Sequence, residues 1–422
     1  MSSPKISNEW NELEYRARQI FSPAAPIDHA QLFAGRHKQI KRLLDAISER
    51  GRHAILYGER GVGKTSLTNI FHMLIGEQAK NLIPLRIQSS PQDNYTSLWG
   101  KVFRDMTFSI TEQQGYGKEK TTTHSIVAKY NDKITPDDVV RELRAVGQGV
   151  SIVIIFDEFD KIESIEAKKL MSHTIKSLSD AGVNATIVIV GVADDINALV
   201  DEHDSVKRNI EEIRMPRMNN DEMKEILAKR FPALGMEIEP DARWKIITLS
   251  RGLPEYIHVL GRNAAVEAIQ HRSTKITEAH VDKSIRDMLF QSDQSSNNSY
   301  RKAIQSNRKD ALYRQVLLAC AMAKTDEEGK FTLTSLIEPL TGILGRRLEI
   351  AGFQSHVSAF CGEERGCILE QYGIPRAYRY RFREPKMQPY VLIQGIDSGD
   401  LSSDILSTLS APEQPSLFSV QQ

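Results

Sequence analysis

The 422-residue sequence contains only three cysteines, Cys320, Cys361 and Cys367. None of them forms a Cys-x-x-Cys pair, so the sequence predicts neither a disulfide framework nor a structural zinc site. Long apolar runs are lacking, and residues 1–20 do not contain the apolar core of a secretory signal. We therefore expect a soluble, cytoplasmic protein without a membrane-spanning segment.

The sequence also lacks an excess of either charge, because 55 Lys and Arg residues balance 55 Asp and Glu residues. This balance excludes a global polyelectrolyte role, so any basic surface has to be local. The length exceeds what one compact core usually holds and predicts two or three domains.

Residues 58–65, Gly-Glu-Arg-Gly-Val-Gly-Lys-Thr, match the phosphate-loop pattern. They follow an apolar run at 54–57 and precede a helix-like segment at 66–75, which is the context that this motif requires. The glycines permit a tight turn whose N–H groups point at phosphate oxygens, and the helix N-terminus adds to the attraction. We expect Lys64 to reach the terminal phosphates and the Thr65 hydroxyl to hold Mg²⁺. The predicted phosphate-binding residues are Gly58, Glu59, Arg60, Gly61, Val62, Gly63, Lys64, Thr65 and Ser66.

A second motif, Asp157-Glu158, ends the apolar run at 152–156. This pattern is typical of a buried parallel strand that delivers two carboxylates to its C-terminal edge. We expect Asp157 to bind Mg²⁺ through water and Glu158 to polarise the water that attacks the γ-phosphate. Without the preceding phosphate loop, the same run is compatible with a strand that meets a solvated turn.

Two further segments resemble AAA+ and STAND ATPases. Residues 32–36, Leu-Phe-Ala-Gly-Arg, precede a helical segment and resemble the N-terminal box whose backbone packs against adenine. The resemblance implies base contacts by Phe33, Gly35 and Arg36, although a plain helix-capping turn has the same composition. Residues 252–254, Gly-Leu-Pro, resemble the Gly-x-Pro element of STAND ATPases, which implies that Pro254 packs near the base. A simple turn that starts a helix also explains this proline.

Asp194 and Arg208 correspond to two polar positions of AAA+ proteins. AAA+ proteins carry a sensor residue, usually Asn or Thr, after the strand that corresponds to residues 185–192, and Asp194 occupies this place. An Asp departs from the common pattern, and helix capping explains it equally well. In AAA+ relatives a downstream arginine reaches the γ-phosphate of a neighbouring subunit. We assign this role to Arg208, because a guanidinium presents several hydrogen-bond donors to phosphate in a fixed geometry. An ordinary surface arginine without such a role explains this residue equally well.

The sequence beyond residue 220 is predominantly helical up to residue 290 and resembles the helical lid of an AAA+ module. A polar stretch at 291–299 predicts a linker. Three helical segments and two strands then follow, a pattern typical of a winged-helix domain. The helices are expected at 310–323, 334–340 and 348–360, and the strands at 366–371 and 377–383.

The second of these strands alternates aromatic residues with Arg379, Arg381 and Arg383. Residues 299–396 contain fifteen Lys and Arg against ten Asp and Glu, a local excess in a neutral chain. We expect the aromatic face to pack on the helices and the three arginines to follow DNA phosphates. A solvated strand face, or a winged helix that contacts protein, has the same pattern.

Together these motifs resemble bacterial AAA+ ATPases of the origin-recognition and replication-initiator family, with STAND-like features. The resemblance implies an α/β P-loop AAA+ core in which helices sandwich a parallel sheet, followed by the lid and winged-helix domain. It also implies ATP and Mg²⁺, a homo-oligomer with ATP at the interface, and a slow switch that binds double-stranded DNA. The alternative is a STAND-type signalling or defence ATPase whose winged helix contacts protein. The lid and the winged helix disfavour a small-molecule kinase.

The predicted domain organisation has six segments. They are an N-terminal extension (1–30), the AAA+ core (31–217), the lid (218–290), the linker (291–299), the winged-helix domain (300–396) and a disordered tail (397–422). Within the tail, residues 414–418, Gln-Pro-Ser-Leu-Phe, resemble the peptide that docks on the bacterial sliding clamp, with Pro415 in place of the usual Leu. An inert tail is the alternative interpretation.

Overall fold

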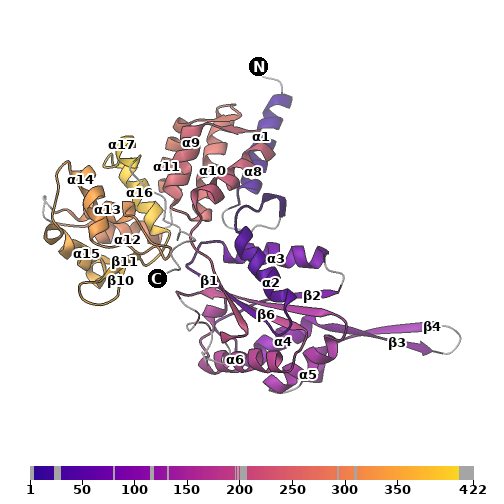
Figure 1. The fold of residues 1–422 in the computed structure, drawn as a ribbon. Coiled ribbons are helices and arrows are strands. Elements are labelled where there is room, and N and C mark those ends of the chain that lie inside the picture. Colours follow the sequence, from indigo (N-terminus) through magenta and orange to yellow (C-terminus); the bar gives the residue numbers. More distant parts are fainter. Residues whose placement is uncertain are drawn as a thin grey trace.

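The structure is a computed structural model. It describes residues 4–22, 30–78, 81–114, 118–130, 133–194, 196, 199, 207–291, 294–307 and 311–407. An α/β core, a group of lid helices and a C-terminal domain follow one another along the chain (Figure 1). In the described part of the chain, no helix combines the length and the apolar content needed to cross a lipid bilayer.

The core is built on a five-stranded parallel sheet with the strand order β2-β5-β6-β1-β7. Its strands are β1 (His53–Gly58), β2 (Leu82–Gln88), β5 (Ser151–Asp157), β6 (Ala185–Val192) and β7 (Ile210–Arg214). Because all five run in one direction, the loop after β1 and the carboxylates that end β5 lie at the same edge, on either side of β6. The predicted parallel sheet is therefore confirmed.

Helices cover both faces of this sheet (Figure 1). Val153 and Ile155 of β5 belong to the apolar cluster that includes side chains of α2 (His37–Ser48) and α3 (Lys64–Gln78). Ile152 and Ile154 belong to a second cluster on the opposite face. That cluster includes side chains of α4 (Tyr95–Asp105), α5 (Pro136–Val146) and α6 (Ile165–Asp180). Alternate residues of one strand thus stabilise two separate layers.

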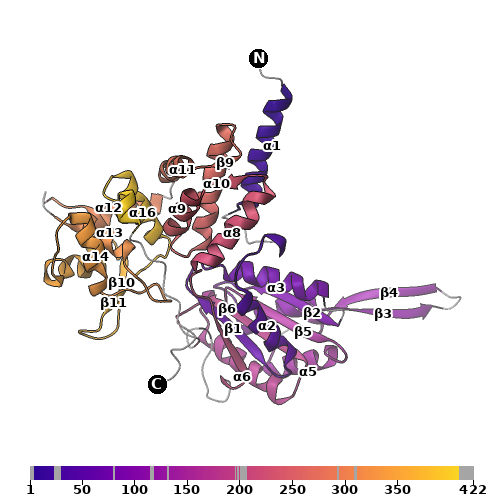
Figure 2. The same ribbon diagram turned by 45° about the horizontal axis from the view of Figure 1, so that its top comes forward.

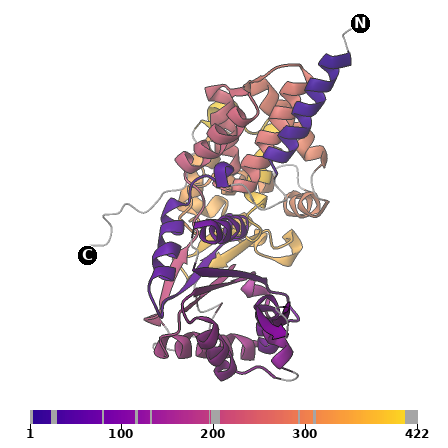
Figure 3. The same ribbon diagram turned by 90° about the vertical axis from the view of Figure 1, so that its right-hand side faces the viewer.

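The lid helices follow the core and pack against the N-terminal helix. They are α8 (Asn220–Ala233), α9 (Pro240–Ser250), α10 (Pro254–Gln270) and α11 (Glu278–Gln291), with a short parallel pair β8 (Glu237–Ile238) and β9 (Lys275–Ile276). The N-terminal helix, α1 (Pro4–Ile20), lies along the lid (Figure 3). At its end the buried Phe21 contacts the backbone of Gly261, where a Cβ would lie 2.6 Å from the Phe21 ring.

The C-terminal domain contains the elements that the sequence predicts for a winged helix. Three helices at the predicted places precede the antiparallel ribbon of β10 (Leu369–Tyr372) and β11 (Arg379–Phe382). These helices are α13 (Tyr313–Met322), α14 (Ile337–Leu344) and α15 (Gln354–Phe360). The domain also contains α12 (Gln294–Ile304), α16 (Met387–Asp397) and α17 (Ser403–Leu406), which the sequence analysis did not predict. Its assignment as a winged-helix domain stays a prediction.

Two expectations about irregular segments are wrong. The stretch 291–299 is not a free linker, because α12 starts at Gln294 and its Ser296 and Tyr300 are buried. The structure also contains a hairpin that the sequence analysis did not address, in which β3 (Thr107–Gln114) pairs with β4 (Lys118–Ser125) and which projects from the core (Figure 2).

The boundary of the predicted disordered tail is also wrong. Leu401 and Leu406, which follow α16, are buried in the C-terminal core. Two leucines are enough to anchor this short polar segment, because the preceding helix brings them to an apolar surface. The sliding-clamp peptide at 414–418 lies outside the described residues.

Candidate nucleotide-binding site

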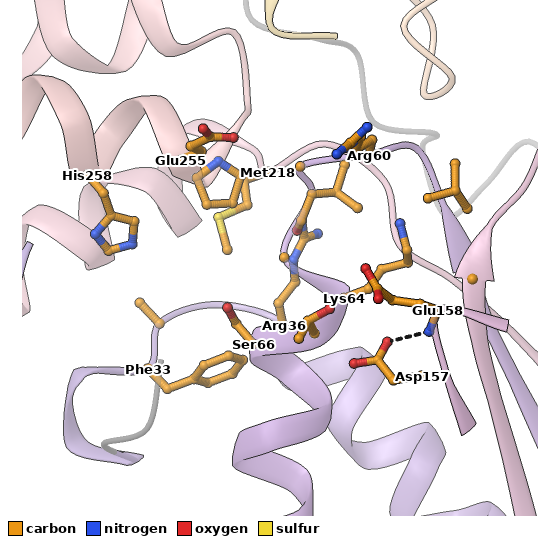
Figure 4. Close-up of a pocket in the computed structure, with 18 of the residues that line it drawn as sticks. Phe33, Arg36, Arg60, Lys64, Ser66, Asp157, Glu158, Met218, Glu255 and His258 are labelled. Carbon is orange, nitrogen blue, oxygen red and sulfur yellow. Dashed lines mark hydrogen bonds between the residues drawn. The ribbon is translucent and has the colours of Figure 1, made fainter. Parts of the chain in front are cut away.

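A cavity of about 480 Å³ lies between the phosphate loop, the edge of the sheet and the lid (Figure 4). One end is lined by charged and polar residues and the other end by mostly apolar ones. The polar end includes Lys64, Thr65, Ser66, Asp157, Glu158 and Asp160. The apolar end includes Phe33, Ala34, Met218, Ile226, Pro254 and His258.

The phosphate loop adopts a backbone conformation that depends on glycine. Gly58 has a φ of 154°, and a Cβ there would lie 2.4 Å from the carbonyl oxygen of Met215. Gly61 and Gly63 have φ values of 86° and 93°, in the region that side chains disfavour. At Gly63 a Cβ would point toward Pro254, 3.8 Å from its Cγ. The loop therefore presents bare backbone to the cavity.

Lys64 is buried at the start of α3 and bends back over the loop. Its Nζ donates hydrogen bonds to the carbonyl oxygens of Gly58 at 2.9 Å and Glu59 at 2.8 Å. Burial lowers the pKa of Lys64 to about 8, although the nearby carboxylates of Asp160 and Asp157 act in the opposite direction. Phosphate oxygens in the cavity would supply the negative charge that this buried ammonium lacks.

Asp157, at the end of β5, is buried and uses both carboxylate oxygens. Oδ1 accepts a hydrogen bond from the Glu158 N–H at 2.9 Å (Figure 4), and Oδ2 accepts one from Nη2 of Arg86 at 2.6 Å. Arg86 is on the neighbouring strand β2. No local sequence signal distinguishes Arg86, because the contact depends on the β2–β5 register.

Glu158 follows Asp157 in a left-handed backbone conformation, with a φ of 55°. Its Oε2 accepts hydrogen bonds from Nε2 of Gln88 at 2.8 Å and from Nζ of Lys161 at 2.7 Å. Burial on its own would raise the pKa of Glu158, but these hydrogen bonds outweigh it and lower the pKa. The side chain is therefore a carboxylate near neutral pH, held by two partners.

Asp160 is a site residue that the sequence analysis missed, although it follows the Asp157-Glu158 motif closely. Its Oδ1 accepts a hydrogen bond from the Val192 N–H at 2.8 Å. A Cβ on Gly191 would lie 3.0 Å from the same oxygen and 2.5 Å from Leu199. Asp160 therefore holds the end of β6 against the site.

The structure does not bring the two predicted AAA+ polar residues into this cavity. At the end of β6 the cavity is lined by Gly191 and Val192. Asp194 lines a neighbouring cavity of about 550 Å³ and accepts a hydrogen bond from Nη1 of Arg381 at 2.6 Å. Arg208 is exposed. The sensing role of Asp194 and the action of Arg208 across subunits stay predictions.

The predicted N-terminal box lies between the cavity and the lid. Phe33 lines the apolar end, and the Gly35 N–H donates to Oε2 of Glu225 on α8 at 2.9 Å. Arg36 is buried, and its Nη2 donates to the Val62 carbonyl of the phosphate loop at 2.8 Å. Burial lowers the pKa of Arg36, and Glu222 partly offsets this effect. Arg36 thus links the box to the phosphate loop.

A buried polar contact that the sequence analysis missed joins the phosphate loop to the C-terminal domain. Arg217 follows β7. Its Nε and Nη2 donate hydrogen bonds to the two carboxylate oxygens of Glu59 in the phosphate loop. Its Nη1 donates a hydrogen bond to the side-chain oxygen of Gln388 on α16. Gln388 in turn donates to the carbonyl oxygen of Ala321 at 2.9 Å. Sequence spacing could not reveal these partners, because they come from three distant segments.

The aromatic face of β11 is buried, as predicted, with Tyr380 1% and Phe382 2% exposed. The arginine face contacts carboxylates. Arg379 is paired with Asp326, and Arg383 lies 3.5 Å from Glu370. Arg381 has only 14% of its side chain exposed because it contacts Asp194 and the Tyr372 hydroxyl. The predicted DNA contacts of the three arginines stay predictions.

The residues of the cavity fit ATP with Mg²⁺. The glycine loop and Lys64 suit phosphate oxygens, the apolar end suits a base, and the Thr65 hydroxyl and Asp157 carboxylate are the oxygen ligands that Mg²⁺ prefers. Among the described residues, no group of three or more His, Cys, Asp or Glu side chains could hold a metal ion. A magnesium ion here would therefore depend on phosphate oxygens as well.

A family model described as Novel STAND NTPase 1, nSTAND1, matches residues 21–319. The chain belongs to the nSTAND1 family. The match covers well over half of the chain, including the phosphate loop, the acidic strand and the lid, and ends within α13. The resemblance to STAND ATPases is therefore confirmed.

Curated relatives agree with the origin-recognition resemblance. The ORC1-type DNA replication protein of Thermoplasma volcanium and the ORC1-type DNA replication protein 2 of Thermoplasma acidophilum are each 24% identical over 264 residues. These alignments cover 59% of this chain and 60% of each relative, so the nSTAND1 chain spans less than two thirds of their length.

Similar solved structures include that of the Aeropyrum pernix ORC1 protein in complex with DNA. The sequence identity is 15% and the TM-score is 0.47, and the match covers 90% of this chain and 96% of that chain. Another is Cdc6p from Pyrobaculum aerophilum, with 16% identity and a TM-score of 0.46 over 91% and 99% of the two chains.

Proposed function

We propose that this nSTAND1 protein binds and hydrolyses ATP and uses its nucleotide state to control the C-terminal domain. The observation that carries the proposal is the convergence of Lys64, Thr65, Asp157 and Glu158 on one end of a cavity whose other end is apolar. Lys64 and Thr65 hold ATP and Mg²⁺, Asp157 orders the metal through water, and Glu158 acts as general base.

Two observations support a proton-accepting role for Glu158. Its lowered pKa keeps it ionised, and its carboxylate lies on the cavity wall near Lys64. When bound, Mg²⁺ neutralises phosphate charge as the γ-phosphoryl group leaves. Gln88 and Lys161 both bind Oε2, so Glu158 has to exchange at least one of these contacts to accept a proton from water. This exchange is compatible with slow turnover.

The contacts of Arg217 support the proposed control of the C-terminal domain. The same guanidinium binds Glu59 in the phosphate loop and Gln388 in α16. Any movement of the loop on nucleotide binding or release therefore changes the packing of α16. The Tyr256 hydroxyl adds a second connection by donating to the Lys386 carbonyl at 2.8 Å.

We infer that the partner of the C-terminal domain is double-stranded DNA. The local basic excess and the half-exposed Arg379 and Arg383 support this partner, and the curated relatives are named as DNA replication proteins. A STAND-type signalling or defence ATPase that contacts protein is the second candidate. The burial of Arg381 against Asp194 favours this candidate, because a guanidinium that is already paired with a carboxylate is not available to a DNA phosphate.

The proposed domain limits are 31–217 for the ATPase core and 218–290 for the lid, with the C-terminal domain starting at α12. A homo-oligomer with Arg208 at the nucleotide of a neighbour, and a clamp contact through residues 414–418, are further proposals.

Two measurements test the proposal. Purified protein should retain ATP with Mg²⁺ and release γ-phosphate to water rather than to an added acceptor. Light scattering after size exclusion, with and without a non-hydrolysable ATP analogue and duplex DNA, should show whether nucleotide changes assembly and DNA binding. A protein that retains no nucleotide would contradict the proposed function.

A further inference from the structure

Strand β2 supplies a basic side chain to the acidic motif at the end of β5. In the parallel register of the two strands, Arg86 lies opposite Ile155. Asp157 follows Ile155 by two residues, so the three side chains lie on the same face of the sheet. Nη2 of Arg86 donates a hydrogen bond to Oδ2 of Asp157 at 2.6 Å. The strand register thus places a fixed positive charge beside the carboxylate that we assign to Mg²⁺.

The ion pair of Arg86 and Asp157 is largely shielded from solvent. The side chain of Asp157 is 3% exposed and that of Arg86 is 27% exposed. Nε of Arg86 is buried and has no hydrogen-bond partner among the described residues. A buried carboxylate without a compensating charge is strongly unfavourable. Arg86 therefore neutralises Asp157 by itself, and no metal ion is required for this.

Arg86 is not needed to orient Asp157. Oδ1 of Asp157 accepts a hydrogen bond from the Glu158 N–H at 2.9 Å, a contact between adjacent residues that does not involve β2 (Figure 4). Arg86 does not belong to the described residues that line the nucleotide cavity. An ionised carboxylate can accept further hydrogen bonds on each oxygen, so the pair leaves room for a metal-bound water. Any effect of Arg86 on a metal ion is therefore electrostatic and acts through Asp157.

We propose that Arg86 makes Mg²⁺ binding depend on the phosphates of the nucleotide. This inference rests on the proposed nucleotide site. The affinity of an oxygen site for a divalent cation depends on the charge of its ligands, and the pair of Arg86 and Asp157 carries no net charge. The ammonium of Lys64 is a second positive charge within electrostatic range of Asp157. The protein groups alone attract Mg²⁺ weakly, so the metal ion binds together with the phosphate oxygens of ATP.

The first test needs no nucleotide. Thermal unfolding of the full chain is followed while MgCl₂ is increased at constant ionic strength. The wild type should unfold at the same temperature throughout. Arg86→Gln leaves the charge of Asp157 uncompensated and should gain a rise in Tm that depends on Mg²⁺, because a ligand that binds only the folded state stabilises it. Adding Asp157→Asn to Arg86→Gln should abolish this gain.

The second test is the Mg²⁺ dependence of the binding of a fluorescent ATP analogue. Arg86→Gln should reach half-maximal binding at about ten-fold lower Mg²⁺ than the wild type, because one repulsive charge is removed from the site. Arg86→Lys keeps the charge and should behave like the wild type.

Arg52→Gln is the matched control for the loss of an ion pair. Nη2 of Arg52 lies 2.7 Å from Oε2 of Glu211. This pair lies at the opposite edge of the sheet, because Arg52 precedes β1 and Glu211 lies near the start of β7. Arg52→Gln should therefore keep the wild-type Mg²⁺ dependence. A shift of equal size in Arg52→Gln and Arg86→Gln would contradict the assignment of Arg86.

The outcomes separate this inference from the proposed function. If the wild type binds no nucleotide, the proposed function fails, and the nucleotide-free titration still decides about Arg86. If the wild type binds nucleotide but Arg86→Gln responds to Mg²⁺ like the wild type in both titrations, the assignment of Arg86 is wrong while the nucleotide site stands. If Arg86→Gln does not fold, Arg86→Met, which keeps the apolar stem of the side chain, replaces it in both titrations.

Discussion

Nη1 of Arg381, in the ribbon of the C-terminal domain, lies 2.6 Å from Oδ1 of Asp194, just after the central strand β6 of the ATPase core. The two residues are 187 positions apart in the sequence. Burial on its own would lower the pKa of Arg381, but the hydrogen bond that Arg381 donates to Asp194 outweighs it and raises the pKa. The pair therefore holds the arginine face of β11 against the core, next to the nucleotide cavity.

Duplex binding should depend on the arginine face and on its release from Asp194. Replacing Arg379, Arg381 and Arg383 by Ala in the full chain should reduce the slope of log affinity against log salt by about two to three, because each phosphate contact releases counterions. The measurement is fluorescence anisotropy with a random-sequence duplex at several salt concentrations.

The substitution Asp194→Asn should increase duplex binding, measured by the same fluorescence anisotropy assay. It should free Arg381 and strengthen duplex binding several-fold, whereas Asp45→Asn, an exposed carboxylate on α2, should not. If wild type shows no duplex binding at low salt, and Asp194→Asn shows none either, the protein-contact function is favoured.

Substitutions in the phosphate loop and acidic strand should separate binding from hydrolysis. Lys64→Ala should abolish ATP binding, because it removes the buried charge that faces the phosphates. Glu158→Gln should retain ATP but release phosphate at least ~100-fold more slowly, because it removes the general base. Filter retention and phosphate release measure the two steps. Equal turnover in Glu158→Gln and wild type would exclude Glu158 from the mechanism.

The contact between Arg217 and Gln388 should couple nucleotide to the C-terminal domain. Gln388→Leu leaves a buried guanidinium N–H without its partner, and should lower the free energy of unfolding by roughly 1–3 kcal/mol. It should also reduce the stabilisation that ATP gives to the C-terminal helices, followed by hydrogen exchange. Gln394→Leu is the control, since it lies on the same helix and contacts Tyr390 instead. Identical ATP effects in both variants would contradict the coupling.

Stability should fall in mild acid because of buried His53. The Nδ1 atom of His53 accepts a hydrogen bond from the Ile187 N–H at 2.9 Å, and burial lowers its pKa to about 3. Between the ordinary value near 6.5 and about 3, the unfolded chain binds a proton that the folded chain excludes. The free energy of unfolding should therefore decrease as pH falls through this window.

Each such histidine contributes a slope of up to about 1.4 kcal/mol per pH unit. His53→Gln should reduce the total slope by about this amount in urea unfolding between pH 6 and 4. His173→Gln, an exposed position on α6, should leave it unchanged. A slope that is the same in all three proteins would mean that His53 takes up its proton in the folded state.

The clamp motif is testable as a peptide. A labelled peptide of residues 411–422 should bind purified bacterial sliding clamp, because Leu417 and Phe418 can be buried in a preformed pocket. Replacing both by Ala should abolish binding. Peptides that bind equally well, or not at all, would leave the tail without this partner.

The phosphate end of the candidate site could be predicted from local sequence patterns. Two local patterns predicted it, because each can be recognised from adjacent residues alone. They are the spacing of Gly58, Gly61, Gly63 and Lys64 and the apolar run before Asp157. The structure places both at one edge of the sheet. The strand Ala185–Val192 was predictable for the same reason, since a mostly apolar run of this length is typical of a buried parallel strand.

The contacts between polar residues could not be predicted in this way, because they depend on the three-dimensional fold. Arg86 contacts Asp157 through strand register, Arg217 joins Glu59 to Gln388, and Asp194 faces Arg381 rather than the nucleotide cavity. The polar composition of residues 291–299 predicted a linker, yet α12 starts within this stretch and packing buries its Ser296. These outcomes depend on partners far apart in the chain, and local propensity does not encode them.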